Sequence, residues 1–216
     1  MDITHPLVQT FQIQRLIVTL HVSHVWSDFL MPLLDTLHEA GIRCLQVPPH
    51  GPDTLLERLR RDGVWVWGVG PVTTPEQLDS PWVSEAHFVT LAYSHPAWPD
   101  WMAQEHPPVL WTGATVSECA EGIRLGAIAV RLFPVSGWDA VRWITQVRKY
   151  FPAWSLIPAG GVNFTNARRF LELGVLALEV DDTLLEPHLI QERNWPALHH
   201  HVREWLRHIQ GFQTID

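Results

Sequence analysis

The feature that most constrains this chain is a repeated alternation of short apolar runs with helical patterns. About eight such units follow one another along the 216 residues, and no long linker or low-complexity segment interrupts them. This alternation is typical of a parallel sheet covered by helices. Eight units in one domain match a closed barrel, whereas doubly wound sheets commonly have fewer strands. We therefore predict an α/β fold, a single (β/α)₈ TIM barrel.

The predicted strands are the runs 15–20, 42–47, 64–67, 86–91, 109–112, 128–133, 155–158 and 175–180. Helices are expected at about 26–40, 52–61, 96–105, 115–125, 137–150 and 165–173, with a short helix that opens at Thr74. Thr74 would cap that helix and Pro75 would take its first position. One domain, 1–216, is expected, with an N-terminal segment 1–14, a barrel at about 15–187 and a C-terminal helix at about 195–210.

Composition argues against several classes of partner and cofactor. The net charge is −8 and no basic run is present, which disfavours nucleic acid. No apolar stretch reaches the roughly 20 residues of a membrane helix, and the N-terminus lacks the pattern of a signal peptide, so we expect a cytoplasmic protein. Cys44 and Cys119 lack metal-ligand spacing and are expected to be buried free thiols. Most of the 12 tryptophans are interpreted as packing residues, and an exposed subset as possible contacts with partners.

In a TIM barrel the chemistry lies at the C-terminal ends of the strands and in the loops that follow. The residues predicted there are His21, Gln46, His50, Gly70, Pro71, Thr90, Thr112, Arg131, Gly160, Gly161, Asp181 and Asp182. They give the predicted barrel mouth a polar lining.

Several segments carry a resemblance to a known family. They are Leu156-Ile-Pro-Ala-Gly-Gly-Val162 before 166–170, Arg131-Leu-Phe-Pro134, and the segments 41–47, 68–72, 74–77 and 184–187. Their order and spacing resemble the 2-keto-3-deoxy-6-phosphogluconate (KDPG) and 4-hydroxy-2-oxoglutarate (KHG) aldolase family from about residue 15 to 187. The resemblance implies a barrel, aldehyde-lyase ancestry, no cofactor and a homo-oligomer, commonly a trimer.

In that family, a lysine on the sixth strand forms a Schiff base with the keto group of pyruvate, and a glutamate on the second strand moves protons. The corresponding residues here are Arg131 and Gln46. A guanidinium stays protonated and is a poor nucleophile, and a glutamine has no proton that titrates near neutral pH. The only lysine, Lys149, falls near the end of the helix 137–150, remote from the strand ends. With these residues at the family's catalytic positions, we expect Schiff-base chemistry to be absent.

The family's substrate-binding positions also differ. Its carboxylate-binding arginine, its third-strand threonine and its fourth-strand Ser-Pro correspond to His50, Pro71 and Leu91-Ala92. Its phosphate site corresponds to Ala159-Gly160-Gly161 and Asp181-Asp182-Thr183. The glycine turn can still present backbone N–H groups to an anion, but two aspartates beside it would repel a phosphate. Phosphorylated substrates are disfavoured, and a small 2-keto acid or other carboxylate is the expected ligand.

An inward guanidinium at Arg131 needs a carboxylate partner or water, and we predict Asp181 or Asp182 as that partner. The candidate ligand-binding residues are His50, Thr112, Arg131, Gly160, Gly161, Asp181 and Asp182.

Three functions remain open. The first is a pseudoenzyme that binds a small carboxylate or a protein partner. The second is a lyase or decarboxylase acting on a small unphosphorylated 2-keto acid, with Arg131 and His50 on the carboxylates. The third is a structural subunit with a filled pocket. A metal held by His21, His50, Asp181 and Asp182 would suit the second function, but no spaced motif supports it, and we assign no metal.

Overall fold

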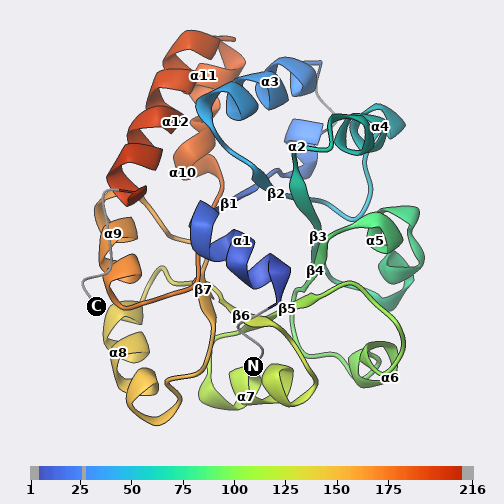
Figure 1. Ribbon diagram of the computed structural model, residues 1–216, viewed down its shortest axis with the longest axis vertical. Coiled ribbons are helices and arrows are strands. Elements are labelled where there is room, and N and C mark those ends of the chain that lie inside the picture. Colours follow the sequence, from blue (N-terminus) through green and yellow to red (C-terminus); the bar gives the residue numbers. More distant parts are fainter. Residues whose placement is uncertain (1–4, 26–27, 211–216) are drawn as a thin grey trace.

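The computed structural model describes residues 5–25 and 28–210. Eight parallel strands form a single (β/α)₈ barrel, which confirms the predicted fold (Figure 1). The strands are β1 Leu16–Thr19, β2 Cys44–Val47, β3 Val66–Val72, β4 Phe88–Leu91, β5 Val109–Gly113, β6 Ala129–Leu132, β7 Leu156–Pro158 and β8 Leu178–Val180. They are hydrogen-bonded in the order β7-β6-β5-β4-β3-β2-β1-β8. At the seam between β7 and β8, the amide of Leu176 donates to the carbonyl of Leu156 at 2.8 Å.

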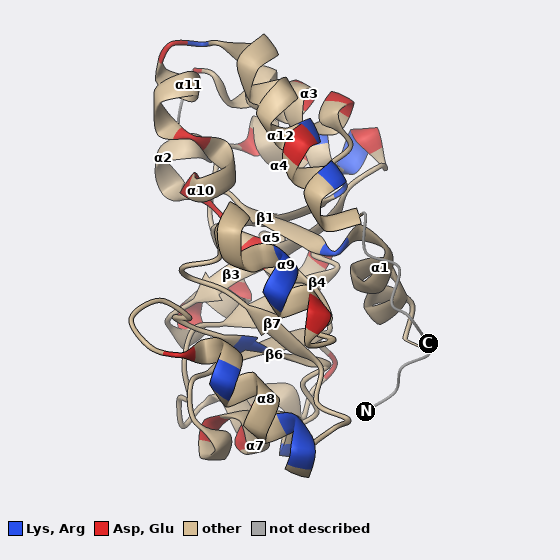
Figure 2. Ribbon diagram, turned by 90° about the vertical axis from the view of Figure 1, so that its left-hand side faces the viewer, with Lys and Arg blue, Asp and Glu red and all other residues tan. Residues whose placement is uncertain are grey.

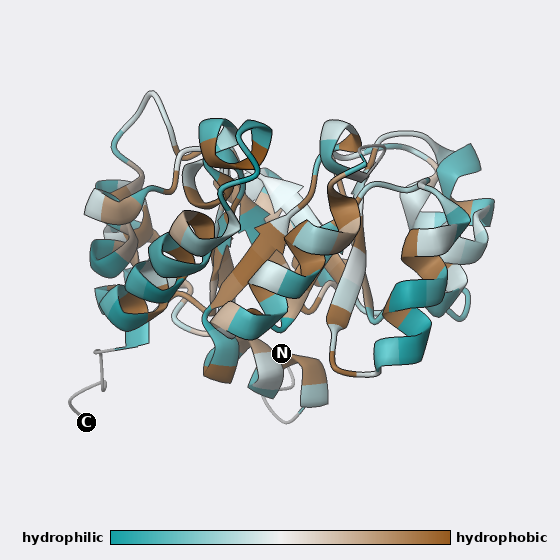
Figure 3. Cartoon of the chain, turned by 90° about the horizontal axis from the view of Figure 1, so that it is seen from above, coloured by the Kyte–Doolittle hydropathy of each residue, from teal (hydrophilic) through white to brown (hydrophobic). Residues whose placement is uncertain are grey.

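Helices surround this barrel (Figure 1). They are α2 Val22–Val25, α3 Leu30–Ala40, α4 Asp53–Asp62, η1 Pro75–Asp79, α5 Pro81–Glu85, α6 Trp98–Met102, α7 Val116–Arg124, α8 Ala140–Tyr150, α9 Phe164–Glu172, α10 Asp182–Leu185, α11 Pro187–Gln191 and α12 Trp195–Gln210. Their inner faces pack on the outward side chains of the strands, and their outer faces are largely hydrophilic (Figure 3). The capping box expected at Thr74 is present, with Pro75 at the first position.

The two largest differences from the predicted boundaries have identifiable reasons, and differences of three residues also occur at Leu178, Met102 and Ala140. The strand expected at 64–67 extends to Val72. Its glycines do not form a turn, and Gly68 instead leaves room for the side chain of Phe88. A Cβ atom on Gly68 would lie 2.2 Å from the ring of Phe88. The helix expected at 26–40 is helical at Val22–Val25 and Leu30–Ala40, and residues 26 and 27 lie outside the described chain.

A helix that was not predicted closes one end of the barrel. The segment 1–14 contains α1 Pro6–Gln14, which crosses the barrel axis in Figure 1 and lies on one side of the strands in Figure 2. Its buried residues Leu7, Val8 and Phe11 pack on inward side chains from the first part of each strand. The ring of Phe11 meets the ring of Phe88 edge-on, with 5.3 Å between centroids. The N-terminal ends of the strands are therefore covered by apolar contacts.

Inward and outward side chains alternate along every strand, as the pleat requires. Above the apolar layer next to α1, the inward positions are polar and buried: Thr19, Gln46, Thr90, Thr112, Arg131 and Glu179. This polar layer faces the end of the barrel opposite α1, where the strands run into the loops that follow them.

Candidate functional site

The centre of the polar layer is an ion pair between Arg131 on β6 and Glu179 on β8. The Nε and Nη2 atoms of Arg131 each donate to a carboxylate oxygen of Glu179, both at 2.7 Å. Only 5% of either side chain is exposed. Two parallel bonds to one carboxylate satisfy the fork of the guanidinium, the strongest geometry for this pair. The predicted partner of Arg131 was therefore wrong: Glu179 holds it, and neither Asp181 nor Asp182 does.

Arg131 is covered on the mouth side by an aromatic ring. The Cζ atom of Arg131 lies 4.2 Å from the ring centroid of Phe133, two residues further along the same strand direction. Thr112 on β5 is the register partner of Arg131, and its buried Oγ1 has no hydrogen-bond partner among the described residues. A cation over a ring is stabilised by the ring quadrupole. The guanidinium is thus held by a carboxylate and a π face, with one unused hydroxyl beside it.

Gln46 on β2 is fixed by two threonines. Its Nε2 atom donates to Oγ1 of Thr19 at 3.2 Å, and its Oε1 atom accepts from Oγ1 of Thr90. Gln46 is fully buried. These bonds use the amide as a cross-link between strands β1, β2 and β4. Neither end of this side chain can take up or release a proton near neutral pH.

Two histidine–aspartate pairs lie where β1 and β8 end. Nε2 of His21 is 3.5 Å from Asp181, and Nε2 of His24 is 3.9 Å from Asp182. The backbone amide of His21 donates to Nδ1 of His24 at 3.0 Å. The hydrogen bond with Asp181 raises the pKa of His21 and lowers that of Asp181, whereas burial lowers the pKa of His24. The pKa values of the two histidines therefore shift in opposite directions.

A cavity of about 210 Å³ opens at the mouth beside these pairs. It lies over the ends of β1, β2 and β3, and its lining includes Thr19, His21, His50, Pro71 and Gln77. His50 is exposed, and no ion pair involves it among the described residues. The cavity has room for a molecule of a few heavy atoms, well below the roughly 300 Å³ at which drug-sized sites begin.

The glycine turn after β7 is shaped for close approach. Gly160 and Gly161 both have positive φ, at 66° and 124°. A Cβ atom on Gly160 would meet the ring of Phe133 at 2.3 Å, and one on Gly161 would meet Cβ of Ser136 at 2.7 Å. The carbonyl of Gly160 accepts from the amides of Val135 and Ser136. The glycines therefore allow the β6 and β7 loops to pack directly on each other.

Most of the predicted site residues come together at this end of the barrel, although Asp181 and Asp182 pair with histidines and not with Arg131. Glu179 was missed. No group of three or more His, Cys, Asp or Glu side chains among the described residues is arranged to hold a metal ion. Cys44 and Cys119 are buried free thiols, as predicted. No helix in the described ranges is long and apolar enough to cross a membrane.

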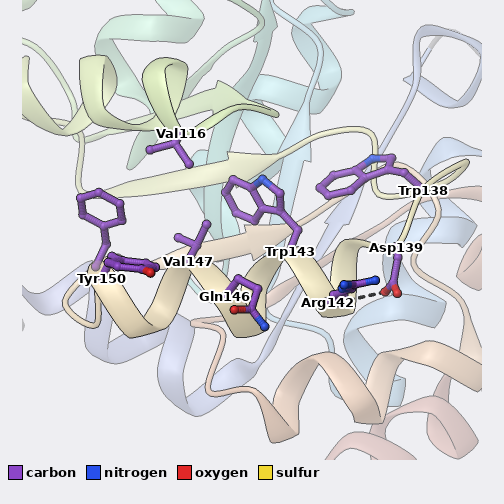
Figure 4. A pocket seen from close by; sticks show the side chains of 9 residues that line it. Val116, Trp138, Asp139, Arg142, Trp143, Gln146, Val147 and Tyr150 are labelled. Carbon is purple, nitrogen blue, oxygen red and sulfur yellow. Dashed lines mark hydrogen bonds between the residues drawn. The ribbon is translucent and has the colours of Figure 1, made fainter.

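Away from the mouth, an apolar groove of about 560 Å³ runs along α8 (Figure 4). Trp138, Trp143, Val147 and Tyr150 line it, with Val116 of α7 opposite (Figure 4). Trp138 is 37% exposed, so not all of the tryptophans are packing residues.

Comparison with known proteins shows which family the chain belongs to. The family model described as KDPG and KHG aldolase matches residues 9–201. The chain belongs to this family. A 2-dehydro-3-deoxy-phosphogluconate aldolase of Haemophilus influenzae is 24% identical over 183 residues, which cover 82% of this chain and 85% of that protein.

Solved structures of the family share the fold. A KDPG aldolase of Legionella pneumophila, with pyruvate captured as a covalent carbinolamine intermediate, superposes with a TM-score of 0.78 at 21% identity, covering 93% of this chain and 98% of the other. A 2-keto-3-deoxy-6-phosphogluconate aldolase of Zymomonas mobilis with 3-phosphoglycerate gives 0.73 at 16% identity, covering 92% and 95%. At these identities the likeness shows the fold alone.

Within this KDPG and KHG aldolase family member, the single lysine lies outside the mouth. Lys149 is in the last turn of α8, exposed, and its Nζ donates to Oε1 of Gln146 at 3.1 Å. Helix α8 ends at the side of the barrel where α1 lies (Figure 2). Lys149 therefore lies at the α1 side of the barrel, away from the mouth.

Proposed function

We propose that this KDPG/KHG-aldolase-like barrel has lost class I aldolase chemistry and acts as a pseudoenzyme that binds a small carboxylate or a protein partner. The observation that carries the proposal is the buried, bidentate pair of Arg131 with Glu179. A carbinolamine requires a neutral amine nucleophile. A guanidinium engaged by a carboxylate at both Nε and Nη2 is protonated and sterically committed.

The second support is Gln46. Aldol cleavage needs a group that moves protons beside the keto acid, and the amide of Gln46 instead bridges Thr19 and Thr90. The third is Lys149, whose exposed position in the last turn of α8 leaves the mouth without a described lysine amine.

The proposed ligand is a small unphosphorylated carboxylate, such as a 2-keto acid. His50 lines the cavity. The proposed site adds the backbone N–H groups of Gly160 and Gly161 and the hydroxyl of Thr112, which has no partner among the described residues. Asp181 and Asp182 place negative charge at the same end, which opposes the dianionic phosphate more than a single carboxylate.

A lyase or decarboxylase acting on a small unphosphorylated 2-keto acid is the alternative, and the pair of His21 with Asp181 favours it. His21 lines the cavity and carries a raised pKa, as a general acid beside a bound keto acid would require. Turnover of pyruvate or oxaloacetate that disappears in His21→Gln would establish this alternative. If neither keto acid is turned over, with or without added divalent metal, the alternative fails.

Reduction with borohydride in the presence of pyruvate tests the main proposal. We expect no stable pyruvyl adduct on Lys149, because no described amine reaches the mouth. Intact-mass and peptide mass spectrometry provide the measurement, and the aldolase of Haemophilus influenzae, treated in parallel, is the positive control. A reduced adduct on Lys149 would contradict the proposal, whereas one on the amine of Met1 would show only nonspecific labelling.

Binding is tested separately from chemistry. Pyruvate titrated into ¹⁵N-labelled protein should shift the signals of His50, Gly160 and Gly161, and His50→Ala should weaken the effect. Val64→Ala, an exposed apolar residue before β3, is the matched control. If pyruvate causes no shifts at the mouth, carboxylate binding is contradicted and the hypothesis of a structural subunit is favoured. Assembly as a homo-trimer and a cytoplasmic location belong to the same proposal.

A further inference from the structure

A second cavity, of about 460 Å³, lies at the closed end of the barrel. It is formed where α1 leads into β1, α8 into β7 and α9 into β8, and its lining includes Arg15, Arg148, Trp154, Leu171 and Leu176. These connections precede the strands, whereas Arg131 and the glycine turn lie toward the strand ends. The cavity is therefore separate from the mouth.

Two guanidinium groups reach this cavity with donors to spare. Arg148 donates from Nη1 to the carbonyl of Pro152 at 3.2 Å and from Nη2 to the carbonyl of Gly174 at 2.5 Å. Its Nε is buried without a hydrogen-bond partner among the described residues. Arg15 makes one long bond, from Nη1 to the carbonyl of Val175 at 3.4 Å. A guanidinium has five N–H donors, so most of those on Arg15 have no partner within residues 5–25 and 28–210.

Neither cation has a counter-ion in the described part of the chain. Within residues 5–25 and 28–210, no carboxylate lies within ion-pair distance of Arg15 or Arg148, and none lines the cavity. Burial lowers the pKa of Arg148, as expected for a cation that no acid compensates. In a chain of net charge −8, two uncompensated arginines in one cavity concentrate positive potential where the rest of the molecule is acidic.

Apolar side chains form part of the cavity wall, beside the polar residues Gln12 and Ser155. Trp154 stacks on Phe151 with 4.1 Å between ring centroids, and its side chain forms part of the lining together with Leu171 and Leu176. Pockets of about 300–1,000 Å³ with apolar walls and a few convergent polar groups are typical of small-molecule sites. The cavity has the size of such a site, and Arg15 and Arg148 supply convergent polar groups.

We propose that this cavity binds a small organic anion, a carboxylate or phosphate monoester with an apolar body. The anionic group would accept from the free donors of Arg15, beside the charge of Arg148, and the apolar body would pack on Trp154. Charge-assisted bonds from guanidinium groups are the strong ones for carboxylate and phosphate. The site is independent of the function proposed for the mouth, since no residue is shared between the two linings.

The experiment uses benzoate, phenyl phosphate and inorganic phosphate as probes of ¹⁵N-labelled protein. We expect saturable shifts of the Trp154 indole and the Gly174 amide, strongest for the two aromatic anions. Arg15→Gln and Arg148→Gln should each raise Kd by about tenfold or more, the usual effect of losing a hydrogen bond to a charged group. Arg124→Gln, an exposed arginine on α7, is the matched control and should leave Kd unchanged.

The outcomes separate cleanly. Arg148 also ties two loops together, so its variant can lose stability; Arg15→Gln removes only one long bond and tests binding alone. A Kd that Arg15→Gln and Arg148→Gln leave unchanged, or shifts centred on His50 and Gly160, would overturn the proposal. Shifts by inorganic phosphate alone, without the aromatic anions, would overturn the assigned ligand class. Pyruvate binding at the mouth should persist in Arg15→Gln, which distinguishes this site from the first.

Discussion

Removing one partner from the Arg131–Glu179 pair would leave a buried, uncompensated charge. We expect Arg131→Ala to lower the free energy of unfolding by about 3–5 kcal/mol, the range for breaking a buried ion pair. Arg131→Met/Glu179→Leu should recover most of this loss, because two apolar side chains leave no unpaired charge. Denaturant melts of the wild type and both variants provide the measurement.

A further variant tests whether Glu179, and not Asp181 or Asp182, is the carboxylate that Arg131 compensates. Arg131→Ala/Asp181→Ala/Asp182→Ala should show the full penalty of Arg131→Ala, because those aspartates pair with His21 and His24 instead. The assignment of Glu179 would be wrong if the triple variant recovered the free energy of unfolding and Arg131→Met/Glu179→Leu did not.

The His21–Asp181 pair predicts a specific pH dependence. The raised pKa of His21 means that its stabilisation is fully present below the histidine pKa of the unfolded chain and is lost as pH rises through the folded pKa. The lowered pKa of Asp181 means that its contribution is lost as pH falls through the folded carboxyl pKa. The pair therefore stabilises the fold between these two folded-state pKa values.

NMR titration of the His21 ring checks the cause of the shift. Asp181→Asn should lower the pKa of His21 more than Asp182→Asn does, because the hydrogen bond to Asp181 is the largest contribution and Asp182 acts only through charge. Equal effects of the two substitutions would mean that the hydrogen bond at 3.5 Å contributes nothing.

Single residues show where sequence reasoning ends. That Arg131 points inward follows from the alternation of its strand, and that a carboxylate should meet it follows from its charge. Which carboxylate does so depends on stagger: tilted strands bring residues to the same height only in one register, and Glu179 pairs with Ile17 of β1. One signal was available, since Glu179 is the only charged residue in the apolar run 175–180.

At the scale of elements, α1 carries a prediction of its own. Phe11 is fully buried beneath the barrel, and Phe11→Ala should lower the free energy of unfolding by about 3–5 kcal/mol through the cavity that it leaves. Ile13 on the same helix is 72% exposed, so Ile13→Ala should change the stability by less than about 0.5 kcal/mol. Thermal or urea unfolding of the two variants, side by side, tests whether α1 is part of the core. Equal effects would show that it is not.

The helix α1 was missed because its signals are short. Pro6 at the first helical position and the spacing of Leu7, Val8 and Phe11 are helical features, but they precede the first strand, where a βα repeat has no place for them. The C-terminal helix, by contrast, is long and strongly periodic, and its predicted range of 195–210 matches α12. Long periodic helices can be predicted from the sequence, whereas a short helix such as α1 is stabilised by the barrel end on which it packs.

For the whole molecule, the alternation of eight units was sufficient to predict the barrel, because few folds accommodate it. Association is a separate property, and we expect light scattering after size-exclusion chromatography to give about three times the 24.7 kDa of one chain. If the assembly is obligate, the molar mass from light scattering should stay constant on dilution through the micromolar range. A mass of one chain at all concentrations would contradict the trimer.

Under the proposed loss of class I chemistry, Glu179 determines how readily that chemistry could return by point mutation. A lysine placed at 131 would put its ammonium beside the carboxylate that now holds the guanidinium, and an opposite charge at that distance keeps an amine protonated. Position 179 would have to change in the same lineage, and Gln46 would have to become an acid. No one of these replacements alone rebuilds a working site, so selection for cleavage has no first step to favour. Under the proposal, the Arg131–Glu179 pair therefore makes a reversal depend on several replacements at once.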